Sequence, residues 1–82
     1  MKHTEFTIEN DTTVPMAIAI EPEGMIMMLE PNSFLVVKED YDASPLTIRL
    51  SEDDSGKVVI CIWPGDGNTI VEKDGKNVLE IT

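Results

Sequence analysis

Histidine and cysteine are almost absent from this 82-residue chain, which contains one of each, His3 and Cys61. A single cysteine excludes an internal disulfide, and small exported domains usually depend on such crosslinks, so we expect a protein of the reducing cytoplasm. One histidine excludes the paired-histidine sites of zinc and blue copper. A Cys–His pair or a Ser–His–Asp triad would need His3, and we expect neither. These residues therefore predict no catalytic, cofactor-binding or metal-binding side chain.

Basic residues are also scarce, because six Lys and Arg stand against sixteen Asp and Glu, for a formal net charge of −10. Phosphate backbones and anionic lipid surfaces repel such a chain, so we expect no nucleic-acid or membrane partner. The acidic residues are spread along the sequence, which is typical of charge used for solubility and for protecting sheet edges. A basic partner, or mimicry of nucleic acid, is the alternative interpretation.

Long apolar runs are missing as well. Even the five-residue run Met25–Leu29 and the six-residue run Val58–Trp63 are far shorter than the roughly 20 residues that span a bilayer. Residues 1–6 read MKHTEF and lack the apolar stretch of a signal peptide, so no export signal is expected. No ten-residue window shows the 3.6-residue period of an amphipathic helix, so helices of any length are not expected either.

Short apolar runs separated by turn residues fill the chain instead, and they predict seven to eight strands. The six-residue run Val58–Trp63 is the most strongly apolar and is expected at the centre of a sheet. Asp74-Gly75 between two runs predicts a type I′ hairpin, and residues 39–45 are expected to form the longest loop. The expected strands are residues 3–9, 16–21, 25–30, 34–38, 46–50, 58–63, 69–73 and 76–81.

Alternating apolar residues give most of these runs one face to bury, as with Leu46, Ile48 and Leu50, which are expected to point inward. Two facing sheets of three to five strands would bury these faces. We therefore predict one domain, residues 1–82, that is a small antiparallel β-sandwich of the Ig-like or a related Greek-key kind. A small, partly open barrel is the alternative.

Loop carboxylates provide the only metal hypothesis, which is calcium. None of the candidate groups has the spacing of an EF-hand, and each is equally explained as ordinary turn chemistry. The candidate groups are Asp40 with Asp42, Asp53 with Asp54, and Asp66 with Asn68.

Two apolar features are candidates for an interaction surface. The run Met25–Leu29 must place side chains on both faces of its strand, so an uncovered face would expose an adaptable, methionine-rich patch. The alternative is a strand covered on both sides. Trp63, the only tryptophan, is either a binding residue or a lid on the core. The candidate surface residues are Met25, Met27, Met28 and Trp63.

Turn motifs give the chain a resemblance to a set of small, functionally uncharacterised bacterial all-β proteins. Asn32 stands where those proteins have glycine, and asparagine tolerates the left-handed conformation that the turn requires. The resemblance implies a compact β domain and brings no catalytic residue with it. The motifs are Asn10-Asp11-Thr12-Thr13-Val14-Pro15, Glu21-Pro22-Glu23-Gly24, Leu29-Glu30-Pro31-Asn32, Trp63-Pro64-Gly65 and Asp74-Gly75.

The sequence thus favours a non-enzymatic binding or interaction module whose partner is another protein. We expect a monomer, or a weak homodimer formed through a sheet edge, with no cofactor. One alternative is an acidic decoy or immunity-type protein that caps a basic partner. Another is a carboxylate-based hydrolase, which would need a cleft with two facing acids.

Overall fold

The computed structural model describes residues 1–80, which fold into eight strands and one short 3₁₀ helix. The all-β class is as the sequence predicted. Each strand after β1 follows a turn signal, because Pro, Gly, Asn and Asp interrupt the apolar runs at those points. The elements are β1 (Lys2–Glu9), β2 (Met16–Ile20), β3 (Met25–Leu29), β4 (Phe34–Tyr41), β5 (Thr47–Glu52), β6 (Val58–Trp63), β7 (Asn68–Lys73), β8 (Lys76–Asn77) and η1 (Val78–Glu80).

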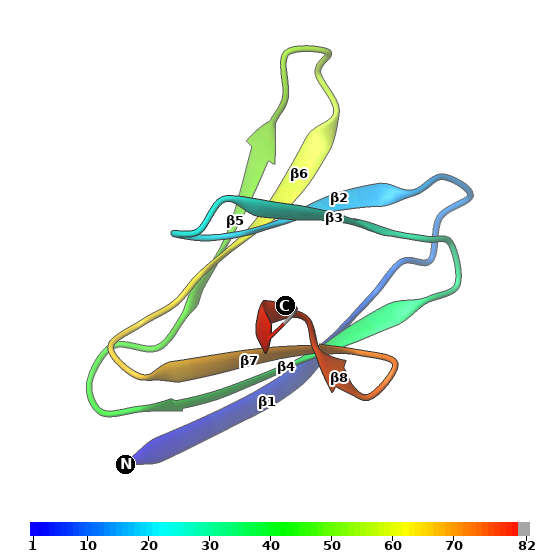
Figure 1. Cartoon of the computed structure of the whole chain (residues 1–82). Helices are drawn as coiled ribbons and strands as arrows, with labels where there is room; N and C mark the ends of the chain where they lie inside the picture. The colour runs from blue at the N-terminus through cyan, green and yellow to red at the C-terminus, as the bar shows by residue number, and fades with distance from the viewer. Residues whose placement is uncertain (81–82) are drawn as a thin grey trace.

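The strands form two four-stranded sheets that pack face to face as a small β-sandwich (Figure 1). Sheet A has the order β1-β4-β7-β8 and sheet B has the order β3-β2-β6-β5. The two sheets are separate, which confirms the sandwich and excludes the single barrel. The apolar strand β6 lies between β2 and β5, as its composition predicted.

One pairing departs from the predicted antiparallel arrangement, because β2 and β6 run parallel, with Ile18 opposite Ile60. Every other strand pairing in the described chain is antiparallel. The chain changes sheet after β1, β3, β4 and β6. Since β2 and β6 are therefore not joined by a hairpin, no turn signal in the sequence fixes their relative direction.

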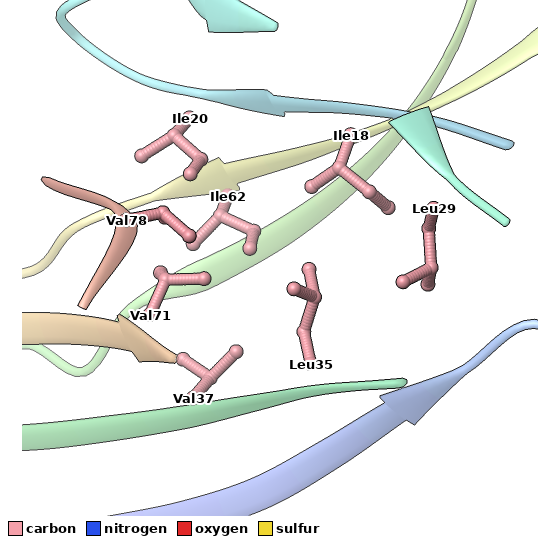
Figure 2. Close-up of a cluster of buried hydrophobic side chains, with 8 residues drawn as sticks. All are labelled: Ile18, Ile20, Leu29, Leu35, Val37, Ile62, Val71 and Val78. Atoms are coloured by element: carbon pink, nitrogen blue, oxygen red, sulfur yellow. The ribbon is translucent and has the colours of Figure 1, made fainter. Parts of the chain in front are cut away.

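The core lies between the sheets and is formed by aliphatic side chains that alternate along each strand (Figure 2). This alternation is the period of two that places every second residue on one face of a strand. The buried cluster consists of Ile18, Ile20, Leu29, Leu35, Val37, Ile62, Val71 and Val78.

Strand β4 is longer than the sequence predicted, because it continues through Glu39 and Asp40 to Tyr41. The extension follows from β1, which pairs with β4 along its whole length, from Glu9 opposite Phe34 to Lys2 opposite Tyr41. The loop expected over residues 39–45 is therefore shorter. Two of its three acidic residues belong to a paired strand.

The last hairpin has the predicted turn, since Asp74 and Gly75 both have positive φ angles of 55° and 78°. Its second strand is shorter than predicted, because β8 ends at Asn77. The Asn77 side chain accepts a hydrogen bond from the backbone N–H of Leu79 at 3.1 Å, which favours a turn over a strand. Val78 then enters the core. Residue 81 of the expected strand lies outside the described residues.

The hairpin formed by β5 and β6 extends away from sheet A at the top of Figure 1. Leu46 packs against the core as predicted, but Ile48 and Leu50 do not. Both side chains lie on the inner side of the hairpin, opposite Ile62 and Ile60. Leu50 is nevertheless 70% exposed, because sheet A does not reach far enough to cover it.

Candidate functional site

The two outer faces of the sandwich differ in chemistry. The outer face of sheet A carries charged side chains from neighbouring strands. Lys38 on β4 forms an ion pair with Glu72 on β7 at 3.1 Å, and His3 on β1 lies 2.8 Å from a carboxylate oxygen of Asp40. The same face also carries Phe34, which is 50% exposed, so it is a mixed face on which charged side chains and ion pairs predominate.

His3 is the titratable group of this charged face. Its imidazole is exposed, and the hydrogen bond to Asp40 is the main reason that the pKa of His3 is raised above its ordinary value of 6.5. The Asp40 charge and nearby Glu5 act in the same direction. His3 therefore remains protonated to higher pH than a free histidine, which suits an ion pair better than a general base.

The outer face of sheet B is mainly apolar over three adjacent strands. The strand registers place Met28, Ala17 and Val59 in one row across β3, β2 and β6. They place Ile26, Ala19 and Cys61 in the next row. No charged side chain occurs in either row on these three strands. Ile26 is 64% exposed and Met28 is 50% exposed, so this side of β3 is open to solvent.

Small residues form the middle of this apolar face. Ala17 and Ala19 lie side by side on β2, between the larger side chains of β3 and those of β6. Ile26 and Met28 lie on one side of β2, and Val59 and Cys61 lie on the other. Between these larger neighbours Ala19 is only 7% exposed.

The candidate surface residues from the sequence do not all share this face. Met28 does, and so does Trp63, which follows Cys61 by two positions on β6 and lies opposite Thr47. Trp63 is partly exposed and lies outside the core cluster, with the Arg49 guanidinium 5.5 Å from its ring. Met25 and Met27 point to the other side of β3 and pack against the core.

Cys61 and His3 lie on opposite outer faces of the sandwich. Cys61 is on the sheet B face, where its Sγ is 3.9 Å from the Ser51 hydroxyl, and His3 is on the sheet A face. Both sheets separate the two residues, so they do not form a nucleophile–base pair. Cys61 is partly exposed rather than fully buried.

Two carboxylates from the proposed calcium loops hold backbone N–H groups of a loop or turn in place. Asp66 accepts hydrogen bonds from the backbone N–H groups of Asp42, Ala43 and Ser44 at 2.9–3.1 Å. These bonds, with the one from Ala43 first, lower the pKa of Asp66 below its ordinary value of 3.8. The Asp66 carboxylate therefore stabilises the loop that follows β4.

Asp53 has the same role in the β5–β6 turn. Its Oδ1 accepts bonds from the Ser55 hydroxyl at 2.6 Å and from the backbone N–H groups of Ser55 and Lys57. The Ser55 hydroxyl is the largest cause of its lowered pKa. Across the described residues, no three His, Cys, Asp or Glu side chains are grouped closely enough to hold a metal ion.

Glu39 is a buried carboxylate that the sequence analysis placed in a loop. It is 1% exposed and points between the sheets. One carboxylate oxygen accepts the backbone N–H of Leu46 at 2.8 Å and the other accepts that of Gly65 at 3.2 Å. One sequence signal indicates this burial: Glu39 continues the alternation of Leu35 and Val37, which places all three side chains on the inner face of β4. Glu39 joins the two loops that cross between the sheets, so its role is structural.

A cavity of about 380 Å³ lies at the end of the sandwich near the β2–β3 turn. Glu21 and Glu23 line it together with the Thr69 side chain, whose buried hydroxyl has no hydrogen-bond partner in the described chain. The described lining contains no histidine, cysteine or lysine. It therefore offers two carboxylates, which a carboxylate-based hydrolase would need, but no Ser–His or Cys–His pair.

A second, mainly apolar cavity of about 660 Å³ adjoins the outer face of sheet B. Met28 and Ala17 from that face line it, together with Val14, Pro15 and Val58. The cavity lies where the β5–β6 hairpin extends past the start of β2. Asp53 and Lys57 from the β5–β6 turn also line it. The cavity enlarges the uncovered surface beside Ala17 and Met28.

No protein-family model, curated protein or solved structure matches the chain. No helix within residues 1–80 is long and apolar enough to cross a membrane.

Proposed function

We propose that the protein is a small non-enzymatic binding module that docks another protein on the outer face of sheet B. The observation that carries the proposal is the contrast between its two outer faces. Exposed Ile26 and Met28 stand on the face of sheet B, whereas the face of sheet A carries ion pairs. Apolar residues gathered on one exposed surface are typical of protein interaction sites.

Three further features support a docking surface. Met28 is flexible enough to fit different partner shapes. Trp63, which is favoured at binding hot spots, extends the same face along β6. The cavity beside Ala17 and Met28 offers room for partner side chains.

Chemistry on substrates is the weaker proposal. The only histidine and the only cysteine are on opposite faces, and Asp53 and Asp66 are engaged with backbone N–H groups. The cavity beside Glu21 and Glu23 is the place at which a carboxylate-based hydrolase would be sought. We assign the protein to the cytoplasm as part of the same proposal, because its lone Cys61 cannot form an internal disulfide.

The test compares two single-lysine variants of the tagged protein in a quantitative capture experiment with cell extract. Met28→Lys places a charge on the apolar face of sheet B, and we expect it to reduce the captured partner at least about tenfold. Thr7→Lys is the matched control. It makes the same change in net charge at an exposed position of an edge strand, on the opposite face.

Both variants should retain the thermal stability of the parent protein, because both positions are exposed. Equal capture by the two variants would overturn the proposal. So would an equal loss of capture by both, since that result would show that net charge alone decides binding.

A further inference from the structure

Among the four sheet edges of residues 1–80, strand β3 is the one that lacks a protective feature. Edge strands expose unpaired backbone groups, and proteins usually blunt them with charge, proline or short length. Edge β1 carries Lys2, His3 and two glutamates, β5 carries Arg49 and Glu52, and β8 has two residues. β3 reads MIMML over five residues and, within the described chain, pairs with β2 alone.

Carboxylates stand at both ends of this edge. Glu21 and Glu23 precede β3 in the turn from β2, and Glu30 follows it directly. Glu23 and Glu30 are exposed, and no lysine or arginine occurs in either turn. A segment that lies along β3 therefore meets an apolar middle with negative charge at each end.

These charges also oppose pairing of β3 with a second copy of the chain. An antiparallel β3–β3 pair would bring Glu23 of one molecule beside Glu30 of the other, at both ends of the pair. Like charges placed opposite each other destabilise a strand pair. Each molecule also carries a net charge of −10. A basic partner gains the attraction that a second copy lacks.

We propose that β3 accepts an extended segment of a basic protein as an additional strand of sheet B. The inference rests on the proposed function, because it specifies how the partner docks. Backbone hydrogen bonds to β3 supply affinity, as in other complexes formed by strand addition. Lysine or arginine residues at the two ends of the segment meet Glu23 and Glu30.

The pleat of the added strand sets its side-chain pattern. Every second residue falls on the outer face beside Ile26 and Met28, where an apolar side chain extends the exposed patch. The intervening residues fall beside Met25 and Met27, which are only partly buried. The segment is therefore an apolar or alternating stretch about as long as β3, flanked by basic residues.

The test measures binding of fluorescent peptides of roughly nine residues to the whole protein by fluorescence anisotropy. The probe has a core of alternating valine and threonine with lysines at both ends. One control has glutamates in place of the lysines, and the other has N-methyl groups on alternate core residues, which block hydrogen bonding to an edge. We expect each control peptide to bind at least about tenfold more weakly than the probe.

Two protein variants separate local attraction from net charge. Glu23→Lys with Glu30→Lys should weaken binding of the lysine-flanked probe about tenfold, and stronger salt should weaken binding to the parent protein. The matched control is Glu5→Lys with Glu9→Lys, which makes the same charge change on the face of sheet A and should have little effect.

Equal binding of the N-methylated peptide would overturn strand addition, and so would equal weakening by the two charge variants. Failure of the probe to bind would also overturn it. If Met28→Lys still abolished partner capture in that case, the proposed docking face on sheet B would stand, and only docking by strand addition to β3 would be wrong. Sedimentation experiments on the protein alone provide a further check. Dimers that form through β3 would overturn the proposal of a basic segment and show that β3 pairs with a second copy of the chain.

Discussion

At the scale of single residues, buried polar groups fix the loops that join the sheets. Glu39 binds the backbone of residues 46 and 65, and Asn10 donates from its buried side-chain amide to the carbonyl groups of Val14 and Leu29. Burying such groups is unfavourable unless each hydrogen bond is made. In this protein both side chains have their partners, so they stabilise the crossings that produce two separate sheets.

Substitution of Glu39 tests this role. Glu39→Leu leaves the N–H groups of Leu46 and Gly65 without acceptors, and each unsatisfied buried group costs about 1–3 kcal/mol. We expect the free energy of unfolding, measured by urea denaturation, to fall by about 2–5 kcal/mol. Glu39→Gln keeps an acceptor oxygen and should lose less. Equal stability of the leucine variant and the parent would contradict the structural role.

Residue-level prediction from the sequence succeeded where one side chain and its own backbone decide the outcome. Asn32 has a φ of 63°, which is the left-handed conformation that asparagine was expected to supply in place of glycine. The partners of Glu39 lie 7 and 26 positions away. No local pattern identifies such contacts, because they depend on where the loops meet in space.

At the scale of elements, the strands were predictable but their neighbours were not. Alternation and turn residues locate β6 and the β7–β8 turn directly. The parallel contact of β2 with β6 and the extension of β4 along β1 depend on chain crossings between the sheets. The run Met25–Leu29 is apolar on both faces, so its composition does not reveal which face remains uncovered.

Neighbouring positions on β3 should therefore contribute differently to stability. Ile26→Thr and Met28→Thr replace exposed side chains with a residue that suits strands, and each should change the free energy of unfolding by no more than about 0.5 kcal/mol. Leu29→Ala removes a side chain that is 1% exposed, and should cost about 2–5 kcal/mol.

Urea denaturation of the three variants beside the parent protein makes this comparison. Losses at Ile26 and Met28 that match the loss at Leu29 would contradict the account, since they would mean that the outer face of β3 is covered in the folded protein.

At the scale of the whole molecule, the two outer faces of the sandwich differ in their balance of charged and apolar side chains, and we propose that the more apolar one docks a partner. Sheet A shows ion pairs such as Lys38 with Glu72, and sheet B shows Ile26 and Met28. The net charge of −10 opposes self-association. The charge and the apolar content can be read from the sequence, but their unequal distribution over the two faces follows from the arrangement of the strands.

The most direct test of the docking face is to map amide chemical shifts in the ¹⁵N-labelled protein as the captured partner is added. We expect the largest changes over residues 17–19, 25–29 and 59–63, which form the outer face of sheet B and its free edge. Changes concentrated on sheet A, over residues 3–9 and 34–40, would contradict the account.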